Sequence, residues 1–322
     1  DQVLELFGIE PDYDLDIMSH GQTLTDISQR TLRGMAGILR EWRPDLVLVH
    51  GDTNTAFAAA LAAFYERIPV GHVEAGLRTP SVQSPFPEEA NRRLIDVLAT
   101  WYFAPTERAA ENLRREGVDP QRIFVTGNTV IDALLAVVEE DYQFKTPELR
   151  GLDFSRPILV VTAHRRENWG EPLVGICQAL LAISAASDLQ IVVAMHKNPD
   201  IQAVMEELLG ADEQIILVDA PGYQEFANLL ARCTLLLTDS GGLQEEAPAL
   251  HKPVLVMREV TERPEALEAG TVRLVGSAKD SIVQGVLELL SDSELYARMS
   301  SAPNPYGDGR AALRICGILQ EK

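Results

Sequence analysis

The chain of 322 residues is poor in cysteine, which argues against a disulfide or zinc framework. Cys177, Cys233 and Cys316 are odd in number, far apart and outside any CxxC pair, as is typical of a reducing cytoplasm. No apolar run approaches the roughly 20 residues that a membrane span needs. We therefore expect a cytoplasmic protein that is held together by a hydrophobic core.

Basic residues are also scarce. Lys and Arg number 28 against 48 Asp and Glu, which gives a formal net charge of −20. Binding to nucleic acid or to an anionic membrane needs a cationic face, so we expect neither partner. The net charge does not exclude binding of an anionic small molecule, because a few local arginines can outweigh the screened field of the whole chain.

The chain does have short apolar runs that alternate with longer amphipathic stretches. Such alternation predicts βαβ units and two doubly wound, Rossmann-like α/β domains. A charged, Pro-ended segment at 139–147 separates two series of these units, so we expect domains at 1–150 and 151–303. The runs expected as parallel strands are Leu46–Val49, Pro69–Val73, Ile123–Val125, Ile158–Val161, Ile191–Val193, Leu235–Leu237 and Val254–Met257.

The sequence opens in a helix-like stretch, Asp1–Phe7, with no strand before it. A Rossmann-like domain normally begins with a strand whose following turn faces the ligand. We therefore expect the first domain, as this sequence gives it, to lack its first strand.

Three carboxylates stand where the first domain would place a site. Asp52 and Glu74 follow apolar runs, and Glu88 lies in the first turn of a Pro-started helix. Ligands bind beyond the carboxyl ends of parallel strands, and a set of carboxylates suits proton transfer at carbon. Helix capping and compensation of the helix dipole are the alternative for each residue alone. A metal site with His50 and His72 lacks supporting spacing, so we expect no metal.

The second domain carries a matching set of polar strand ends. His164 follows one apolar run, and His196 lies near the end of another. Ser240-Gly241-Gly242 opens a helix after a third run, where free N–H groups and the helix dipole favour phosphate; the alternative is a tight turn alone. Glu246 is placed to accept bonds from ribose hydroxyls, and Arg263 to clamp a diphosphate.

Eight motifs, in order along nearly the whole chain, resemble those of the bacterial non-hydrolysing UDP-N-acetylglucosamine 2-epimerases. Each motif alone is weak, but the ordered set is highly specific. The motifs are His50–Thr53, Gly71–Arg78, Pro87–Arg92, Gly127–Asp132, His164–Asn168, Thr238–Pro248, Arg263–Glu265 and Asn304–Gly309.

The resemblance implies a GT-B-like fold with the nucleotide in an interdomain cleft and a C-terminal helix, 304–322, crossing back to the first domain. It implies reversible conversion of UDP-N-acetylglucosamine to UDP-N-acetylmannosamine through 2-acetamidoglucal, without NAD or metal. It further implies a homodimer, activation by the substrate at a neighbouring site, and supply of surface polysaccharide synthesis.

The resemblance also assigns roles to single residues. Asp52, Glu74 and Glu88 match the family's catalytic carboxylates, and His164 matches its histidine near the diphosphate. The substrate-binding residues that it implies are Arg92, His196, Phe226 (on the uracil side), Ser240, Gly241, Gly242, Glu246 and Arg263.

Three other functions stay open at this point. A hydrolysing epimerase would release N-acetylmannosamine and UDP instead of UDP-N-acetylmannosamine. A GT-B glycosyltransferase would use the same nucleotide cleft but gives no reason for three carboxylates at strand ends. A catalytically silent nucleotide-sugar sensor would bind without exchanging the C2 hydrogen. The family's first strand ends in Gly-Thr-Arg-Pro-Glu followed by lysine, a pattern outside this sequence, and its absence favours the sensor.

Overall fold

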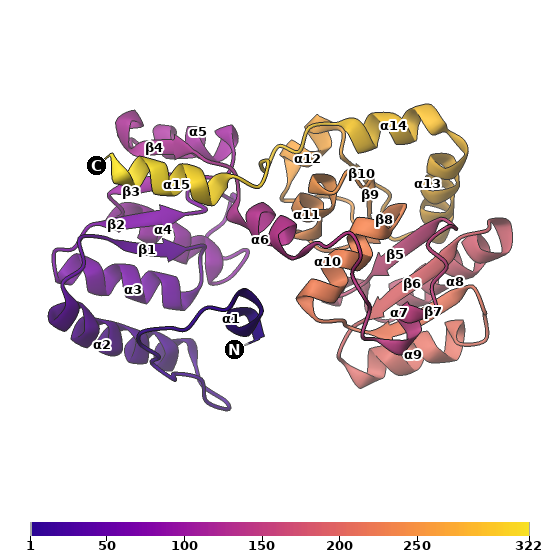
Figure 1. Cartoon of the computed structure of the whole chain (residues 1–322), viewed down its shortest axis with the longest axis horizontal. Coiled ribbons are helices and arrows are strands. Elements are labelled where there is room, and N and C mark those ends of the chain that lie inside the picture. The colour runs from indigo at the N-terminus through magenta and orange to yellow at the C-terminus, as the bar shows by residue number, and fades with distance from the viewer. Residues whose placement is uncertain (1, 322) are drawn as a thin grey trace. The chain divides into compact units, whose positions relative to one another are not determined.

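The computed structural model describes residues 2–321 and all of their side chains except that of Arg166. The chain divides into two compact units, Asp1–Thr129 with Gly309–Lys322 (unit 1) and Val130–Asp308 (unit 2). Each unit has its own parallel sheet with helices packed against it (Figure 1). The predicted α/β class with two Rossmann-like units is confirmed.

Unit 1 has a four-stranded sheet in the order β1-β2-β3-β4, and all of its pairings are parallel. The strands are β1 (Val47–His50), β2 (Val70–Val73), β3 (Trp101–Ala104) and β4 (Ile123–Val125). The helical segments of this unit are α1 (Gln2–Phe7), α2 (Leu24–Trp42), α3 (Asn54–Tyr65), α4 (Glu88–Leu98), α5 (Glu107–Arg115), η1 (Pro120–Arg122) and α15 (Ala311–Gln320).

Local sequence explains where these helices begin and how closely they pack. A capping box of Thr23 and Asp26 starts α2, because each side chain accepts a hydrogen bond from the other residue's backbone N–H. Thr53 caps α3 through Ala56 N. Buried alanines along α3, such as Ala60 and Ala62, let that helix approach its neighbours closely.

Unit 2 has a six-stranded parallel sheet in the order β10-β9-β8-β5-β6-β7. The chain builds outward from β5 to β7 and then returns to the other side of β5, so the topological switch lies between β5 and β8. The strands are β5 (Ile158–Thr162), β6 (Gln190–Met195), β7 (Ile215–Asp219), β8 (Leu235–Thr238), β9 (Val254–Val256) and β10 (Val272–Leu274).

The helical segments of unit 2 surround a sheet whose central strands are buried along their whole length, as expected for parallel strands covered on both faces. They are α6 (Thr129–Val137), α7 (Pro147–Arg150), η2 (Arg166–Asn168), α8 (Glu171–Ala186), α9 (Pro199–Leu209), α10 (Tyr223–Arg232), α11 (Leu243–Ala249), α12 (Pro264–Ala269), α13 (Lys279–Ser291) and α14 (Ser293–Ser301). Across residues 2–321, no helix is both long and apolar enough to cross a bilayer.

The division between the units falls at Thr129/Val130, earlier than the expected boundary near residue 150. The reason is that α10 holds the connecting segment. Asn228 Nδ2 donates to Val137 O at 2.8 Å, and the buried carboxylate of Glu225 accepts from Thr146 N at 2.8 Å. The second division falls at Asp308/Gly309, and α15 belongs to unit 1, where Arg314 Nη1 donates to Thr126 O at 3.1 Å.

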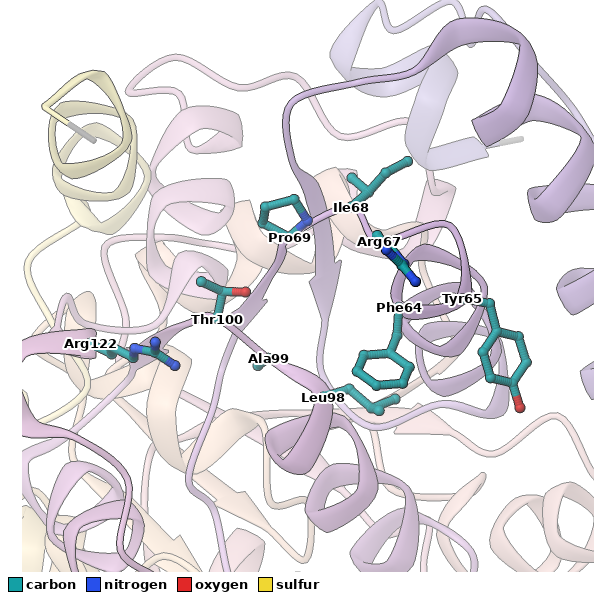
Figure 2. Close-up of a pocket in the computed structure, with 9 residues that line it drawn as sticks. All are labelled: Phe64, Tyr65, Arg67, Ile68, Pro69, Leu98, Ala99, Thr100 and Arg122. Atoms are coloured by element: carbon teal, nitrogen blue, oxygen red, sulfur yellow. The ribbon is translucent and has the colours of Figure 1, made fainter.

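A surface pocket of unit 1 lies at the amino-terminal ends of its strands (Figure 2). Phe64 and Tyr65 line it from the end of α3, and Leu98 lines it from the end of α4. Ligands of parallel sheets bind at the opposite, carboxyl-terminal edge, so this pocket is separate from the candidate site.

Candidate active site

Asp52 and Glu74 lie just beyond the carboxyl ends of the adjacent strands β1 and β2. Gly51 turns the chain with φ +68°, and a Cβ there would lie 3.2 Å from Glu74 Oε2, so this position needs glycine. Glu74 itself has φ +67°, a left-handed conformation that non-glycine residues seldom adopt. Strain of this kind in a carboxylate at a strand end is a feature of functional sites.

Helix α4 holds Asp52 from two sides. Arg92 Nη2 pairs with Asp52 Oδ2 at 2.6 Å, and Asn91 Nδ2 donates to Asp52 O at 2.9 Å. Arg92 is also within 3.2 Å of the buried Glu89. The predicted substrate contact Arg92 is therefore, in this structure, the partner of the predicted catalytic Asp52.

Glu74 contacts Asn128 and His50. Asn128 Nδ2 donates to Glu74 Oε1 at 3.3 Å, and His50 Nε2 lies 3.6 Å from Glu74 Oε2. Burial, and then the positive charge of His72, lower the pKa of His50. A neutral imidazole next to Glu74 leaves this carboxylate able to accept a proton.

The two carboxylates at the start of α4 have different roles. Glu89 is fully buried, accepts from Thr79 N at 3.0 Å and pairs with Arg93 at 2.6 Å, so it anchors the turn before the helix. Glu88, the first residue of α4, is half-buried. Glu88 can therefore take part in chemistry, whereas Glu89 is a structural residue.

The second cluster lies in unit 2, at the switch between β5 and β8. Asp239, which follows β8, is fully buried and accepts hydrogen bonds from the backbone N–H groups of His164 and Arg165 at 2.9–3.0 Å. Asn168 Nδ2 donates to the same carboxylate at 2.8 Å. Asp239 thus fixes the loop of His164, a role that sequence reasoning missed although the residue lies in a quoted motif.

The Ser240-Gly241-Gly242 turn follows Asp239 and leads into α11. Ser240 N donates to Thr238 Oγ1 at 3.0 Å, and Gly242 begins α11 without a side-chain cap. A Cβ on Gly241 would lie 2.8 Å from Glu262 Oε1, so a larger residue there would displace that carboxylate. Glu262 pairs with Arg165 at 2.7 Å and with Arg258 at 2.5 Å, which places two guanidinium groups beside the turn.

His164 is packed among rings and keeps a neutral form. Its ring centroid lies 5.6 Å from that of His196, and the Trp169 ring lies 5.6 Å from His196. Burial lowers the pKa of His164; Asp239 opposes this shift, and His196 adds to it. A neutral His164 can donate a hydrogen bond from one ring nitrogen and accept with the other.

Glu246 and Phe226 are both half-buried, on α11 and α10. Burial, and then the charge of Glu245, raise the pKa of Glu246 to about 7. Arg263 pairs with the buried Glu245, so the predicted diphosphate clamp is held by a carboxylate that sequence reasoning did not single out. Across the described residues, no group of three His, Cys, Asp or Glu side chains could hold a metal ion.

Comparison with known proteins adds an independent observation. The model of the family described as UDP-N-acetylglucosamine 2-epimerase matches residues 1–320. The chain belongs to this family. A curated UDP-N-acetylglucosamine 2-epimerase of Escherichia coli (strain K12) is 53% identical over 99% of this chain and 87% of its own length.

Two solved structures, one of them of a UDP-GlcNAc 2-epimerase, have the same fold. The epimerase of Neisseria meningitidis bound to UDP-GlcNAc has a TM-score of 0.87 and 44% identity, over 100% of this chain and 88% of that one. The S. aureus MnaA–UDP structure has a TM-score of 0.89 and 44% identity, over 99% and 86%. The resemblance to bacterial UDP-N-acetylglucosamine 2-epimerases and the GT-B-like fold that it implied are thereby confirmed.

Proposed function

We propose that this chain is a UDP-N-acetylglucosamine 2-epimerase that interconverts UDP-N-acetylglucosamine and UDP-N-acetylmannosamine without net hydrolysis. The observation that carries the proposal is the pair of carboxylates, Asp52 and Glu74, beyond the ends of adjacent parallel strands in a chain of this family. Inversion at C2 needs a base on one side of the sugar and an acid on the other, and carboxylates can serve as both.

The reaction proceeds by elimination and re-addition. The C1–O bond to UDP breaks, its electron pair leaves with UDP, and a carboxylate takes the C2 proton to form 2-acetamidoglucal. A proton then adds to the opposite face at C2, and UDP re-forms the bond at C1. Asp52, Glu74 and Glu88 are the groups that carry these protons.

The cluster of unit 2 holds the nucleotide in this proposal. The Ser240–Gly242 turn and the guanidinium groups of Arg165 and Arg258 stabilise the charge on the departing diphosphate. His164, with its lowered pKa, donates a hydrogen bond to the diphosphate. Glu246 accepts from the ribose, and Phe226 lies on the uracil side.

The remaining substrate contacts that we propose are Arg92, His196 and Arg263. Arg92 and Arg263 already pair with carboxylates, Asp52 and Glu245. A guanidinium that is paired in this way is held in a fixed orientation toward the nucleotide sugar.

Hydrolytic epimerisation is the second candidate. It would begin with the same elimination, but water would add at C1 and release N-acetylmannosamine and UDP. The common first half uses the same carboxylates, so the products distinguish the two reactions.

Proton NMR of UDP-N-acetylglucosamine with the protein in deuterated water tests the proposal. We expect deuterium at C2 and growth of UDP-N-acetylmannosamine, with no cofactor added. Accumulation of free N-acetylmannosamine would support the hydrolytic reaction, and UDP binding without exchange would indicate a silent sensor.

Matched variants identify the groups responsible. Glu74→Gln should slow exchange by about 10²–10⁴-fold, the usual contribution of a general acid or base. Glu294→Gln, an exposed carboxylate of α14 in unit 2, should leave the rate unchanged.

We further propose a cytoplasmic homodimer that is activated by its own substrate and supplies surface polysaccharide synthesis. Large apolar side chains exposed on α3 and α4, among them Tyr65 at 65% and Val97 at 80%, support self-association. Light scattering should give twice the 35.4 kDa of one chain. A mass of one chain, or a hyperbolic dependence of rate on UDP-N-acetylglucosamine, would contradict the dimer or the activation respectively.

A further inference from the structure

One buried histidine has no part in the proposed chemistry. It lies in β2, near the strand ends that Asp52 and Glu74 follow. His72, in β2 opposite Val49 of β1, is completely buried. Its Nδ1 lies 2.6 Å from Asp96 Oδ1 of α4, and its Nε2 lies 2.9 Å from the carbonyl oxygen of Gly51. The ring therefore joins α4 to the turn that carries Asp52.

The partners determine where the protons lie. A carbonyl oxygen can only accept, so Nε2 carries a hydrogen that it donates to Gly51 O. Asp96 Oδ2 accepts from Arg78 Nη2 at 2.7 Å, which favours the ionised carboxylate and makes Nδ1 a donor as well. The ring of His72 is then a buried imidazolium.

Fixed opposite charges surround this imidazolium. Arg78 also pairs with Glu116, the C-cap residue of α5, at 2.6 Å, so the cations His72 and Arg78 are balanced by the anions Asp96 and Glu116. Tyr102 donates to the backbone oxygen of Asp96 at 2.8 Å. The charges of this network balance and its polar groups are hydrogen-bonded. The network therefore holds the ring in one orientation.

Four polar groups of the Gly51–Asp52 turn are held by hydrogen bonds. Gly51 N donates to Val73 O at 3.0 Å, and Gly51 O accepts from His72. Asp52 O and the Asp52 carboxylate are held by Asn91 and Arg92. The contact from His72 reaches this turn from a side chain of β2, and Glu74 directly follows the same strand.

We propose that His72 is a positioning residue of the reaction: its Nε2–H holds the Gly51 carbonyl and thereby sets the place of Asp52 relative to Glu74. The inference rests on the proposed function. Asp96, Arg78 and Glu116 hold the imidazole in that orientation. His72 acts on the sugar chemistry in unit 1 and not on nucleotide binding, which the residues of unit 2 provide.

Two substitutions separate the two hydrogen bonds of the ring. Glutamine can place its amide nitrogen near the position of Nε2, and asparagine near that of Nδ1. His72→Gln thus retains a donor for Gly51 O, and His72→Asn retains a donor for Asp96. If His72 only filled a buried ion pair, His72→Asn would be the milder change.

The expected result is a split between kcat and KM. His72→Gln should keep kcat within about tenfold of the unsubstituted chain, whereas His72→Asn should lose about 10²-fold or more, the effect of misplacing a reacting group by about 1 Å. KM for UDP-N-acetylglucosamine should change little in both. Equal kcat values, a milder His72→Asn, or a loss confined to KM would each overturn the proposal.

A measurement on the unsubstituted protein tests the proposal even if the variants fail to fold. Nitrogen-15 NMR of the histidine rings should show a doubly protonated His72 whose two N–H protons exchange slowly with water. A ring that lacks the hydrogen on Nε2 would contradict the proposal whatever the variants do. If the unsubstituted chain shows no exchange at C2, the proposed function fails and the positioning role fails with it. If the unsubstituted chain exchanges the C2 hydrogen but His72→Gln and His72→Asn have equal kcat values, only the positioning role is overturned.

Discussion

Glu246 shows how a single residue's environment sets its chemistry. Burial and the neighbouring Glu245 raise its pKa to about 7, well above the ordinary value of a glutamate. A carboxyl with such a pKa changes protonation within the physiological range, and its ability to accept hydrogen bonds from a ribose changes with it.

We expect UDP affinity to rise with pH if Glu246 is the ribose acceptor. With a pKa of about 7, the acceptor form grows about tenfold from pH 6 to pH 8. Calorimetric titration with UDP should show this rise, and Glu246→Gln should remove it. Glu294→Gln should retain the slope. A pH-independent affinity in the unsubstituted chain would refute the ribose role.

The same shift has a consequence for stability. The folded state binds the Glu246 proton more tightly than the unfolded state does, so it holds more protons between the unfolded and folded pKa values. This contribution to stability is therefore complete at acid pH and is lost as the pH rises through about 7. Glu246→Gln should gain stability relative to the unsubstituted chain mainly at pH 8.

Sequence predicted which residue types stand at the strand ends, but not which of them pair with one another. Asp52 and Glu74 lie where the apolar runs placed them. The pairing of Arg92 with Asp52 depends on how α4 packs over the sheet, a tertiary contact between residues 40 positions apart. Glu88 and Glu89 could not be told apart, because only the packing shows which of them is buried.

At the scale of elements, most of the strands lie in predicted apolar runs, and the length of a strand does not decide which were missed: β4 and β9, with three residues each, were predicted, and β7, with five, was not. Sequence analysis did not identify β3, β7 or β10. Strand β3 begins three residues after α4 ends, so its aromatic residues extend an apolar helix pattern. Strand β10 has the charged Arg273 between its two apolar residues, so it shows no apolar run. Strand β7 follows the apolar end of α9 with a short turn between them.

The carboxylate of Asp239 joins two elements, the end of β8 and the loop after β5, and this predicts the effect of an isosteric change. In Asp239→Asn, an amide NH₂ would face N–H donors of His164, Arg165 or Asn168. Loss of hydrogen bonds to a charged acceptor costs about 1.5–3 kcal/mol, so UDP affinity should fall about tenfold or more.

The control for this prediction is another carboxylate of unit 2. Asp212 accepts from Ser184 Oγ at 3.0 Å and from Gln214 N at 2.9 Å, away from the strand ends of the candidate site. Asp212→Asn should lower the melting temperature without weakening UDP binding. If both variants bind UDP as the unsubstituted chain does, the loop fixed by Asp239 has no part in nucleotide binding.

At the scale of the whole molecule, the three cysteines report on the two units separately. Cys316 is exposed on α15 of unit 1, whereas Cys177 and Cys233 are buried in unit 2. Burial raises the pKa of Cys177 to about 11 and that of Cys233 to about 12. A thiol reagent should therefore modify Cys316 at once and the other two only when unit 2 opens.

UDP should slow the reaction of the buried thiols selectively, because a ligand bound to the folded state of unit 2 opposes its opening. At a UDP concentration of 100 times Kd the stabilisation is about 2.7 kcal/mol, which corresponds to about a hundredfold slower labelling of Cys177 and Cys233. Mass spectrometry of the labelled peptides would measure each site, with Cys316 as the internal control. Unchanged rates at the buried thiols would mean that unit 2 does not hold the nucleotide. Slowing only at Cys316 would assign the nucleotide to unit 1.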